Sequence, residues 1–196
     1  MKLDRDIDVT TLPDVYEPSE DSFLLLRSVD ISPGESMLEL GCGTGIVALH
    51  AAKLGASVTA ADISPIAIEC TRRNAARNDL KVKVVRSDLF EDIRGSFDVV
   101  AFNPPYLPRE GGSTSWIERS WDGGDQGSEV SVRFLEQAWK HLAPGGRAYL
   151  VLSSIGGLMS VLRAARERYE AELIAEERMF FESVYVYRLK ARHFGI

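Results

Sequence analysis

The sequence predicts an α/β protein with an open, mostly parallel sheet of seven strands, an antiparallel pair of strands at one edge, and helices on both faces. Short apolar runs alternate with longer amphipathic stretches, which is the pattern of parallel strands joined by helices. A glycine-rich turn follows the first apolar run directly, and two strand-like runs come in succession near the C-terminus. We expect a single domain over residues 1–196, because this length suffices for one full core.

The first helix is predicted to begin near Pro18. A proline suits a helix start, a serine caps one, and the acidic residues that follow suit the positive end of the helix dipole. The preceding residues 1–15 are polar without a clear period, and we expect them to be loosely ordered. Four oxygen-bearing side chains crowd this helix start, and we interpret them as one wall of a binding site: Ser19, Glu20, Asp21 and Ser22.

A strand at 36–40 runs into the turn Gly41-Cys42-Gly43-Thr44-Gly45 and a helix at 46–54. Such a unit binds nucleotides, because its glycines let the backbone approach a ligand and the helix N-terminus faces that ligand. The glycine spacing differs from the dinucleotide pattern Gly-x-Gly-x-x-Gly. Glu39, just before the turn, would repel a pyrophosphate but could orient a cationic amino acid group or the turn itself.

A second acidic residue, Asp62, ends the strand predicted at 57–62. An acid about 20 residues beyond the glycines is placed to accept both hydroxyl hydrogens of a ribose. Either acid alone is ordinarily a solvated side chain, but Glu39 and Asp62 at two strand ends together favour a nucleoside site. Ser64 and Pro65 then start a helix that runs to about Asn78.

The third strand, at 81–86, is predicted to lie at an edge of the sheet. Its lysines could simply discourage pairing with other chains, or its valines could receive a strand from a partner. Beyond its end, Asp88 is placed for an exocyclic amine such as that of adenine, with Leu89 against the ring.

A fourth strand, at 97–102, leads into Asn103-Pro104-Pro105-Tyr106. The two prolines stop the strand and hold the backbone stiffly at the edge where open α/β sheets bind ligands. An amide, a carbonyl without a competing neighbouring N–H and an aromatic face then suit a flat acceptor that carries an NH2 group. The simpler alternative is a rigid loop with a tyrosine packed on it.

The rest of the chain supplies a long loop and the last elements. The segment 107–125 is rich in glycine, including Gly111 and Gly112, yet carries Trp116 and Trp121. These tryptophans either form a lid over the substrate or anchor the loop to the core. The remaining elements are predicted as a helix at 128–142, a strand at 147–152, a helix at 158–169, and strands at 171–177 and 183–189.

Composition excludes several classes of function. Lysine and arginine number 23 against 29 acidic residues, a net charge of −6, which argues against a large nucleic-acid footprint. The chain contains no run of apolar residues long enough for a membrane span and begins with charged residues, so we expect a cytoplasmic protein. Cys42 and Cys70 have no nearby histidine at zinc spacing, so neither a metal site nor a disulfide is expected.

Taken in this order, the motifs resemble those of class I S-adenosylmethionine-dependent methyltransferases, which have a Rossmann-like fold. LELGCGTG is similar to the cofactor motif of that superfamily, and NPPY to its signature for methylating planar amino nitrogens. VYEPSEDSFLL and SWDGGDQG resemble the HemK/PrmC family of protein glutamine-N5 methyltransferases, which act on the Gly-Gly-Gln motif of translation termination factors. Few residues precede YEPSED, so the chain resembles the short archaeal and eukaryotic branch without the N-terminal helical domain.

The resemblance implies S-adenosylmethionine as cofactor and assigns residues to it. The implied cofactor-binding residues are Ser22, Glu39, Gly41, Cys42, Gly43, Asp62, Ile63, Asp88, Leu89 and Asn103. Asn103, Pro104, Pro105 and Tyr106 would hold the acceptor. The resemblance also implies a small zinc-binding activator that adds a strand to the sheet edge near Lys81 to Arg86, and it matches Trp121 and Gly127 to family positions.

Three alternatives remain at this point. A nucleic-acid adenine-N6 methyltransferase would share every catalytic residue, although the acidic balance and the lack of an extra target-recognition region argue against it. A non-catalytic cofactor-binding module would be expected to lose the Asn-Pro-Pro-Tyr site, which is intact here. A nicotinamide-dependent dehydrogenase requires a different glycine spacing.

Overall fold

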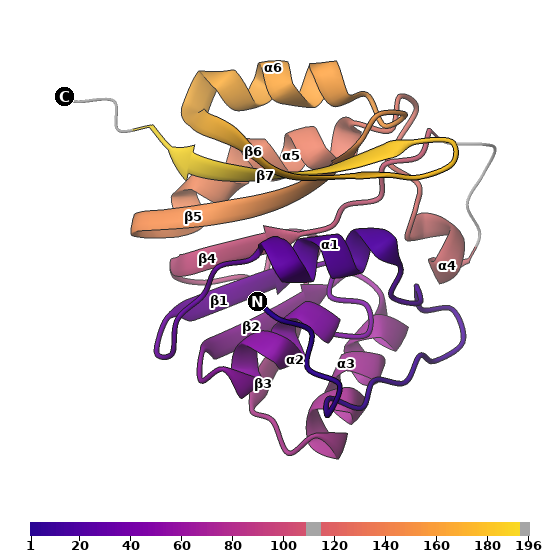
Figure 1. The fold of residues 1–196 in the computed structure, drawn as a ribbon, viewed down its shortest axis with the longest axis vertical. Coiled ribbons are helices and arrows are strands. Elements are labelled where there is room, and N and C mark those ends of the chain that lie inside the picture. The colour runs from indigo at the N-terminus through magenta and orange to yellow at the C-terminus, as the bar shows by residue number, and fades with distance from the viewer. Residues whose placement is uncertain (109–114, 193–196) are drawn as a thin grey trace.

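A computed structural model describes residues 1–108 and 115–192, which contain one seven-stranded sheet in the order β3-β2-β1-β4-β5-β7-β6 (Figure 1). The strands are β1 (Ser36–Leu40), β2 (Ser57–Asp62), β3 (Val82–Arg86), β4 (Phe97–Phe102), β5 (Leu142–Ser153), β6 (Tyr169–Arg178) and β7 (Ser183–Ala191). The first five strands pair in parallel, whereas β7 pairs antiparallel with both β5 and β6. The predicted fold class is confirmed.

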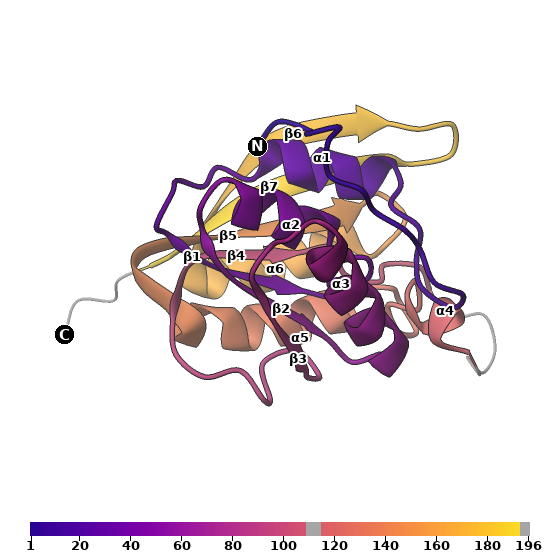
Figure 2. The same ribbon diagram turned by 90° about the horizontal axis from the view of Figure 1, so that it is seen from below.

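Helices cover both faces of the sheet (Figure 2). The longer helices are α1 (Glu20–Ser28), α2 (Ile46–Lys53) and α3 (Pro65–Arg77) on one face, and α5 (Glu129–Ala138) and α6 (Leu158–Arg168) on the other. Successive strand residues point to opposite faces, so Met37 packs under α1 and α2 while Leu38 packs under α5 and α6. The short helix α4 (Trp116–Arg119) lies beyond the end of the sheet (Figure 1).

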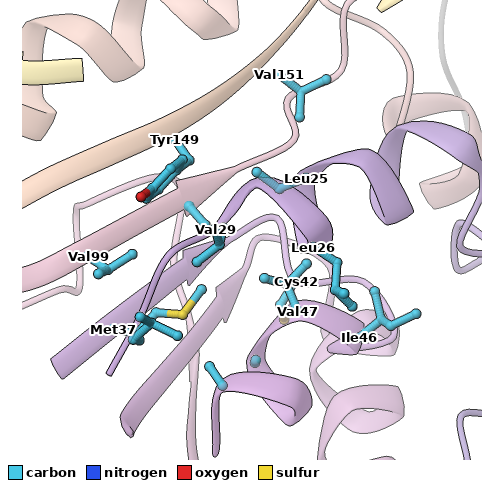
Figure 3. Packing of buried hydrophobic residues seen from close by; sticks show 14 of the residues in the cluster. Leu25, Leu26, Val29, Met37, Cys42, Ile46, Val47, Val99, Tyr149 and Val151 are labelled. Carbon is cyan, nitrogen blue, oxygen red and sulfur yellow. The ribbon is translucent and has the colours of Figure 1, made fainter. Parts of the chain in front are cut away.

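The core under α1 fixes that helix against the middle of the sheet. Leu25, Leu26 and Val29 of α1 and its C-terminal end are fully buried and belong to the same cluster as Met37 and Tyr149 (Figure 3). Burying such side chains stabilises the fold by about 1.5–3 kcal/mol each. The N-terminus of α1, with its acidic residues, is therefore held at the edge where the parallel strands end.

The predicted boundary between the helix at 128–142 and the strand at 147–152 is wrong. The helix α5 ends at Ala138 and is followed by the 3-10 helix η1 (Trp139–His141), and β5 begins already at Leu142. Leu142 pairs with Phe97, after which the register shifts before Val99 meets Arg147. The residues between, including Gly145 at φ +78°, contain a proline and two glycines, which are typical of a helix end, but form an irregular start of the strand. The other elements differ from prediction by one or two residues at their ends.

The N-terminal segment, for which the sequence predicts no element, contains no helix or strand and runs across α2 and α3. The backbone N–H of Asp4 donates to His50 Nε2 over 3.0 Å, and that of Thr10 donates to Asn74 Oδ1 over 3.1 Å. These contacts lead the chain to Tyr16 at the end of the sheet. In the described part of the chain, no helix is both long and apolar enough to cross a bilayer.

Candidate active site

A pocket of about 380 Å³ opens at the carboxyl ends of β1, β2 and β4, between the start of α1 and α4. This is the edge at which open α/β sheets bind ligands. All of the residues singled out for the cofactor or the acceptor line it: Ser22, Glu39, Gly41, Cys42, Gly43, Asp62, Ile63, Asp88, Leu89, Asn103, Pro104, Pro105 and Tyr106. Trp116 and Trp121 line it as well, while Gly111 and Gly112 lie outside the described residues.

The side chain of Asn103 is oriented by the buried carboxylate of Asp21. Asn103 Nδ2 donates to Asp21 Oδ2 over 2.9 Å, and a carboxylate can only accept, so the NH2 end of the amide must face it. The other end of the amide, Asn103 Oδ1, is buried and has no hydrogen-bond partner among the described residues. A buried carbonyl oxygen without a donor is costly, so it suits a ligand that brings an N–H.

Asp21 connects the two aromatic hydroxyls of the site with this amide. The hydroxyl of Tyr106 donates to Asp21 Oδ2 over 3.3 Å, and that of Tyr16 donates to Asp21 Oδ1 over the same distance. Burial, followed by the charge of Asp21, raises the pKa of both tyrosines well above the ordinary value. Both hydroxyls therefore stay protonated and can donate to Asp21, whose oxygens accept from all three side chains, whereas Asn103 Oδ1 accepts no hydrogen bond from the described residues.

Three glycines let other segments approach the backbone of the Asn-Pro-Pro-Tyr loop. A Cβ at Gly123 would lie 2.8 Å from the carbonyl oxygen of Pro105, and a Cβ at Gly156 would lie 2.5 Å from that of Tyr106. A Cβ at Gly127 would also overlap the carbonyl oxygen of Tyr106, and Gly127 adopts φ +73°. The loop is therefore packed against backbone on two sides, which holds Asn103 and Tyr106 in place.

The segment after the loop pairs with it directly. The N–H of Leu107 donates to the carbonyl of Trp121 over 2.8 Å, and the N–H of Gly123 donates back to the carbonyl of Leu107 over 2.8 Å. Trp121 is 40% exposed and borders the pocket, so its ring is not buried in the core.

Glu39 lies beneath the glycine turn. Its Oε2 accepts from the backbone N–H of Ala48 in the first turn of α2 over 2.8 Å, so it contacts the positive end of that helix. Burial nevertheless raises the pKa of Glu39 to about 8, and the nearby charge of Asp62 acts in the same direction. The side chain therefore holds a proton near neutral pH, until a cation in the pocket favours the ionised form.

Asp62 supports the turn from the neighbouring strand. Its Oδ2 accepts from the N–H of Gly43 over 3.0 Å, and its Oδ1 accepts from that of Ser64 over 2.9 Å. Burial raises its pKa above the ordinary value. Each carboxylate oxygen has a second lone pair, so Asp62 can still accept from a ligand hydroxyl. Gly41, Gly43 and Gly45 of the turn all adopt positive φ.

Asp88, the acidic residue assigned to the adenine, already forms an ion pair within the chain. Asp88 Oδ2 lies 3.1 Å from Arg133 Nη2 of α5, and Arg133 also borders the pocket. Leu89 is buried with φ +48°, a conformation rare for leucine, and the hydroxyl of Ser87 donates to its carbonyl over 2.9 Å. A residue held in such a conformation aims its side chain at a fixed place, here the pocket wall.

Sequence reasoning gave no specific role to four residues that the fold brings to this site. Asp21 was included only as part of a polar helix start, and the partnership of Tyr16, Arg133 and Gly156 with the site was not predicted. The YEPSED motif contains the signal for Tyr16 and Asp21, because it places a tyrosine hydroxyl and a carboxylate at one helix start. Arg133 and Gly156 are distant in the chain and leave no local signal.

Comparison with known proteins agrees with this geometry. The family model described as "Methyltransferase small domain" matches residues 6–181. A putative protein N5-glutamine methyltransferase of Methanocaldococcus jannaschii is 35% identical over 178 residues, which covers 89% of this chain and 90% of that protein. Methyltransferase HEMK2 of Mus musculus is 40% identical over 153 residues, 70% of this chain and 71% of that protein.

A solved structure shares the fold over nearly the whole chain. The E. cuniculi Mtq2–Trm112 complex, described as responsible for methylation of the translation termination factor eRF1, matches with a TM-score of 0.74 and 27% identity. The match covers 91% of this chain and 99% of that chain.

Proposed function

This chain belongs to the methyltransferase small domain family and is a HemK-type methyltransferase, and on that basis we propose that it methylates the side-chain amide nitrogen of a protein glutamine. The acceptor that we propose is the Gly-Gly-Gln motif of a translation termination factor, acted on in the cytoplasm. The names of its relatives support this choice. The observation that carries it is Asn103 Oδ1, a buried acceptor of a pocket-lining residue that receives no hydrogen bond from the part of the chain that the structure describes.

The pocket fits S-adenosylmethionine as cofactor. At Gly41 and Gly43 the backbone lines the pocket with no side chain in the way. This suits the close approach of a ligand that joins a nucleoside to an amino acid. We assign Asp62 to the ribose hydroxyls, Asp88 and Leu89 to the adenine, and Glu39 to the cationic amino acid end. Ser22, Cys42 and Ile63 complete the contacts. When bound, the cofactor supplies an electrophilic methyl group on a sulfonium.

The acceptor amide is prepared by two hydrogen bonds from its NH2 group. An amide nitrogen is a poor nucleophile, because its lone pair is delocalised into the carbonyl. If Asn103 Oδ1 and the Pro104 carbonyl each accept one N–H, positive charge that develops on the nitrogen is stabilised as it appears. Tyr106 would hold the amide plane, and Pro105 would keep the backbone rigid. The nitrogen loses its proton only after the N–C bond begins to form, so no strong base is required.

The experiment that tests the proposal supplies S-adenosylmethionine labelled in its methyl group together with one acceptor at a time. We expect label in the glutamine of an intact termination factor and none in duplex or single-stranded DNA. Mass spectrometry of the digested factor assigns the modified residue. Label in DNA and none in the factor would reverse the choice of acceptor.

The second candidate, adenine-N6 methylation of nucleic acid, uses the same hydrogen-bond geometry on a flat NH2 group. Two features support the protein acceptor over it. The chain carries a net charge of −6, and Asp14 and Glu182 line the pocket, so phosphates near the mouth would be repelled. A non-catalytic module remains the third reading, and the oriented Asn103 argues against it because a binding module needs no acceptor site.

We also propose a small partner protein at the free edge of β3. Mtq2 was solved in complex with Trm112. In this chain β3 ends the sheet, its exposed Lys83 alternates with the half-buried Val82 and Val84, and its outer backbone edge faces no other strand among the described residues. A zinc-binding activator paired at Lys81 to Arg86 would complete the sheet. Co-purification of a small zinc protein with the tagged chain tests this, and a strand-blocking Val84→Pro change should abolish it.

A further inference from the structure

The turn between β6 and β7 exposes two adjacent phenylalanines. Phe180 is 92% exposed and Phe181 is 88% exposed, and their rings meet edge to face with centroids 4.8 Å apart. The turn itself is closed by the N–H of Met179, which donates to the carbonyl of Glu182 over 2.8 Å. Neither ring contributes to the core, so the fold gains little from these residues. A function at the surface explains them better.

The hairpin tip stands at the mouth of the pocket. Glu182, directly after Phe181, lines the pocket and accepts a hydrogen bond from the hydroxyl of Ser153 at the end of β5. The N–H of Ser154 donates to the carbonyl of Ser183 over 2.9 Å, which fixes the hairpin to β5. Figures 1 and 2 both show this hairpin end on the same side of the molecule as α4.

Further exposed apolar side chains gather at this end of the sheet. Ile155 is 45% exposed and Met159 is 68% exposed, and both follow β5 on either side of Gly156, which packs against Tyr106. Trp121 is 40% exposed and borders the pocket. We call this set the apolar rim: Trp121, Ile155, Met159, Phe180 and Phe181. Exposed apolar side chains that gather around a pocket in this way mark a site of protein contact.

We propose that the apolar rim, with Phe180 and Phe181 as its anchors, is the surface on which the methylated protein docks on one side of its acceptor glutamine. The inference rests on the proposed function and adds the docking element to it. Glu182 lines the pocket and directly follows Phe181, so a protein whose glutamine side chain enters the pocket on this side covers the hairpin tip. Aromatic anchors beside a pocket carry much of the affinity in protein interfaces.

The charges around the mouth define the partner further. The chain before α1 exposes Asp14, which lines the pocket, and Glu17, and the first residue of α1, Glu20, is exposed as well. Acidic residues outnumber basic ones in the pocket lining, which includes Asp14 and Glu182 against Arg119 and an Arg133 that is paired with Asp88. The docking surface of the substrate is therefore expected to combine an apolar patch with basic side chains on the other side of the glutamine. A second copy of this chain, which is itself acidic, fits that mouth poorly.

The test compares the double variant Phe180→Ser/Phe181→Ser with wild type on two substrates, an intact termination factor and a short Gly-Gly-Gln peptide. We expect the KM for the intact factor to rise at least tenfold, with kcat changed less than twofold, cofactor affinity unchanged and the peptide KM little affected. Leu54→Ser/Leu173→Ser removes two other exposed apolar side chains, each 46% exposed, and should leave all constants unchanged. Phe180→Leu/Phe181→Leu should restore most of the affinity.

The outcomes separate cleanly. An active wild type whose Phe180→Ser/Phe181→Ser variant keeps its KM for the factor overturns the docking inference alone. A wild type that methylates no termination factor defeats the proposed function and the inference with it. Sedimentation velocity tests whether a second copy of this chain occupies the rim instead. If the wild type is a dimer and the double variant is a monomer, the rim serves self-association and the inference is overturned.

Discussion

The amide of Asn103 and the carboxylate of Asp21 lie 82 residues apart in the chain and 2.9 Å apart in the fold, with the amide NH2 donating to the carboxylate. Because Asp21 is 4% exposed and fixed by the packing of α1, it determines which end of the Asn103 amide faces the pocket. The free end is the carbonyl oxygen, the group that an acceptor NH2 requires. Asp21 thus acts as a positioning residue for the proposed chemistry.

Replacing Asn103 tests the proposed acceptor contact directly. Asn103→Ala removes Oδ1 and with it one of the two hydrogen bonds to the acceptor nitrogen, so we expect kcat to fall by about 100-fold or more. Cofactor affinity, measured by calorimetry, should stay within a few-fold of wild type. A parallel loss of cofactor binding with no separate defect in methyl transfer would contradict the assigned role.

Replacing Asp21 tests the orientation of Asn103. In Asp21→Asn the new side chain carries both a donor and an acceptor, so it no longer selects one orientation of the Asn103 amide, and we expect kcat to fall by about tenfold. Asp21→Leu should be more severe, because it leaves Asn103 Nδ2 buried without an acceptor. Single-turnover rates at saturating cofactor measure the effect. Rates equal to wild type in both variants would remove Asp21 from the mechanism.

The raised pKa of Glu39 predicts a pH dependence of cofactor binding. The free protein holds a proton on Glu39 below about pH 8, and a cationic ligand end favours the ionised form, so binding releases this proton. Affinity should therefore rise between pH 6 and about 8 and level off above. Calorimetry in buffers of different ionisation enthalpy measures the released proton. Glu39→Gln should bind more weakly and lose this dependence, and a variant that keeps it would assign the proton to another group.

The same carboxyl predicts how stability responds to pH. Glu39 has a higher pKa in the folded chain than in the unfolded chain, so the folded state binds more protons in the window between them. Its contribution to stability is complete below the unfolded pKa, near 4.5, and is lost as the pH rises through about 8. Glu39→Gln should therefore be more stable than wild type at pH 8.5 in chemical denaturation without cofactor. At pH 5 this advantage of the variant should be smaller or absent.

Asp62 is expected to act on binding rather than on transfer. Asp62→Ala removes the proposed acceptor for the ribose hydroxyls and the support for Gly43, so the cofactor Kd should rise by about 10- to 100-fold. At saturating cofactor, kcat should stay near wild type. Calorimetry provides the Kd, and a thermal melt controls for loss of folding. An unchanged Kd refutes the ribose role.

The glycine contacts of the Asn-Pro-Pro-Tyr loop predict a steric effect. In Gly127→Ala the new Cβ overlaps the carbonyl oxygen of Tyr106, so the loop must shift and we expect kcat to fall at least tenfold. Gly145→Ala is the matched control, because Gly145 has a similar φ of +78° but nothing within 4 Å of its Cβ position. Both variants carry the same backbone strain, so equal activities would show that the overlap at Tyr106 is relieved without cost.

The order of strands and helices and the place of the site were determined by the sequence itself. Apolar runs with a glycine turn after Leu40 or prolines after Asn103 predict strands that end abruptly, and parallel strands place their carboxyl ends at one edge. The residues that follow the carboxyl ends of these strands therefore lie close together at that edge, and this does not depend on the details of packing. This is why each residue assigned to the cofactor or the acceptor lies on one pocket. The junction before β5 was missed because a proline and two glycines favour a helix stop over an irregular strand.

Only the tertiary structure decided which side chains are partners. Asp21 contacts Asn103 because α1 packs across the sheet, Asp88 meets Arg133 because α5 lies beside the pocket, and Gly156 fits the carbonyl of Tyr106 because β5 passes next to β4. Hydrogen bonds and steric contacts extend over a few ångströms, whereas local sequence patterns report periodicity and turns along the chain. Long-range pairs of this kind arise only when packing brings their elements together.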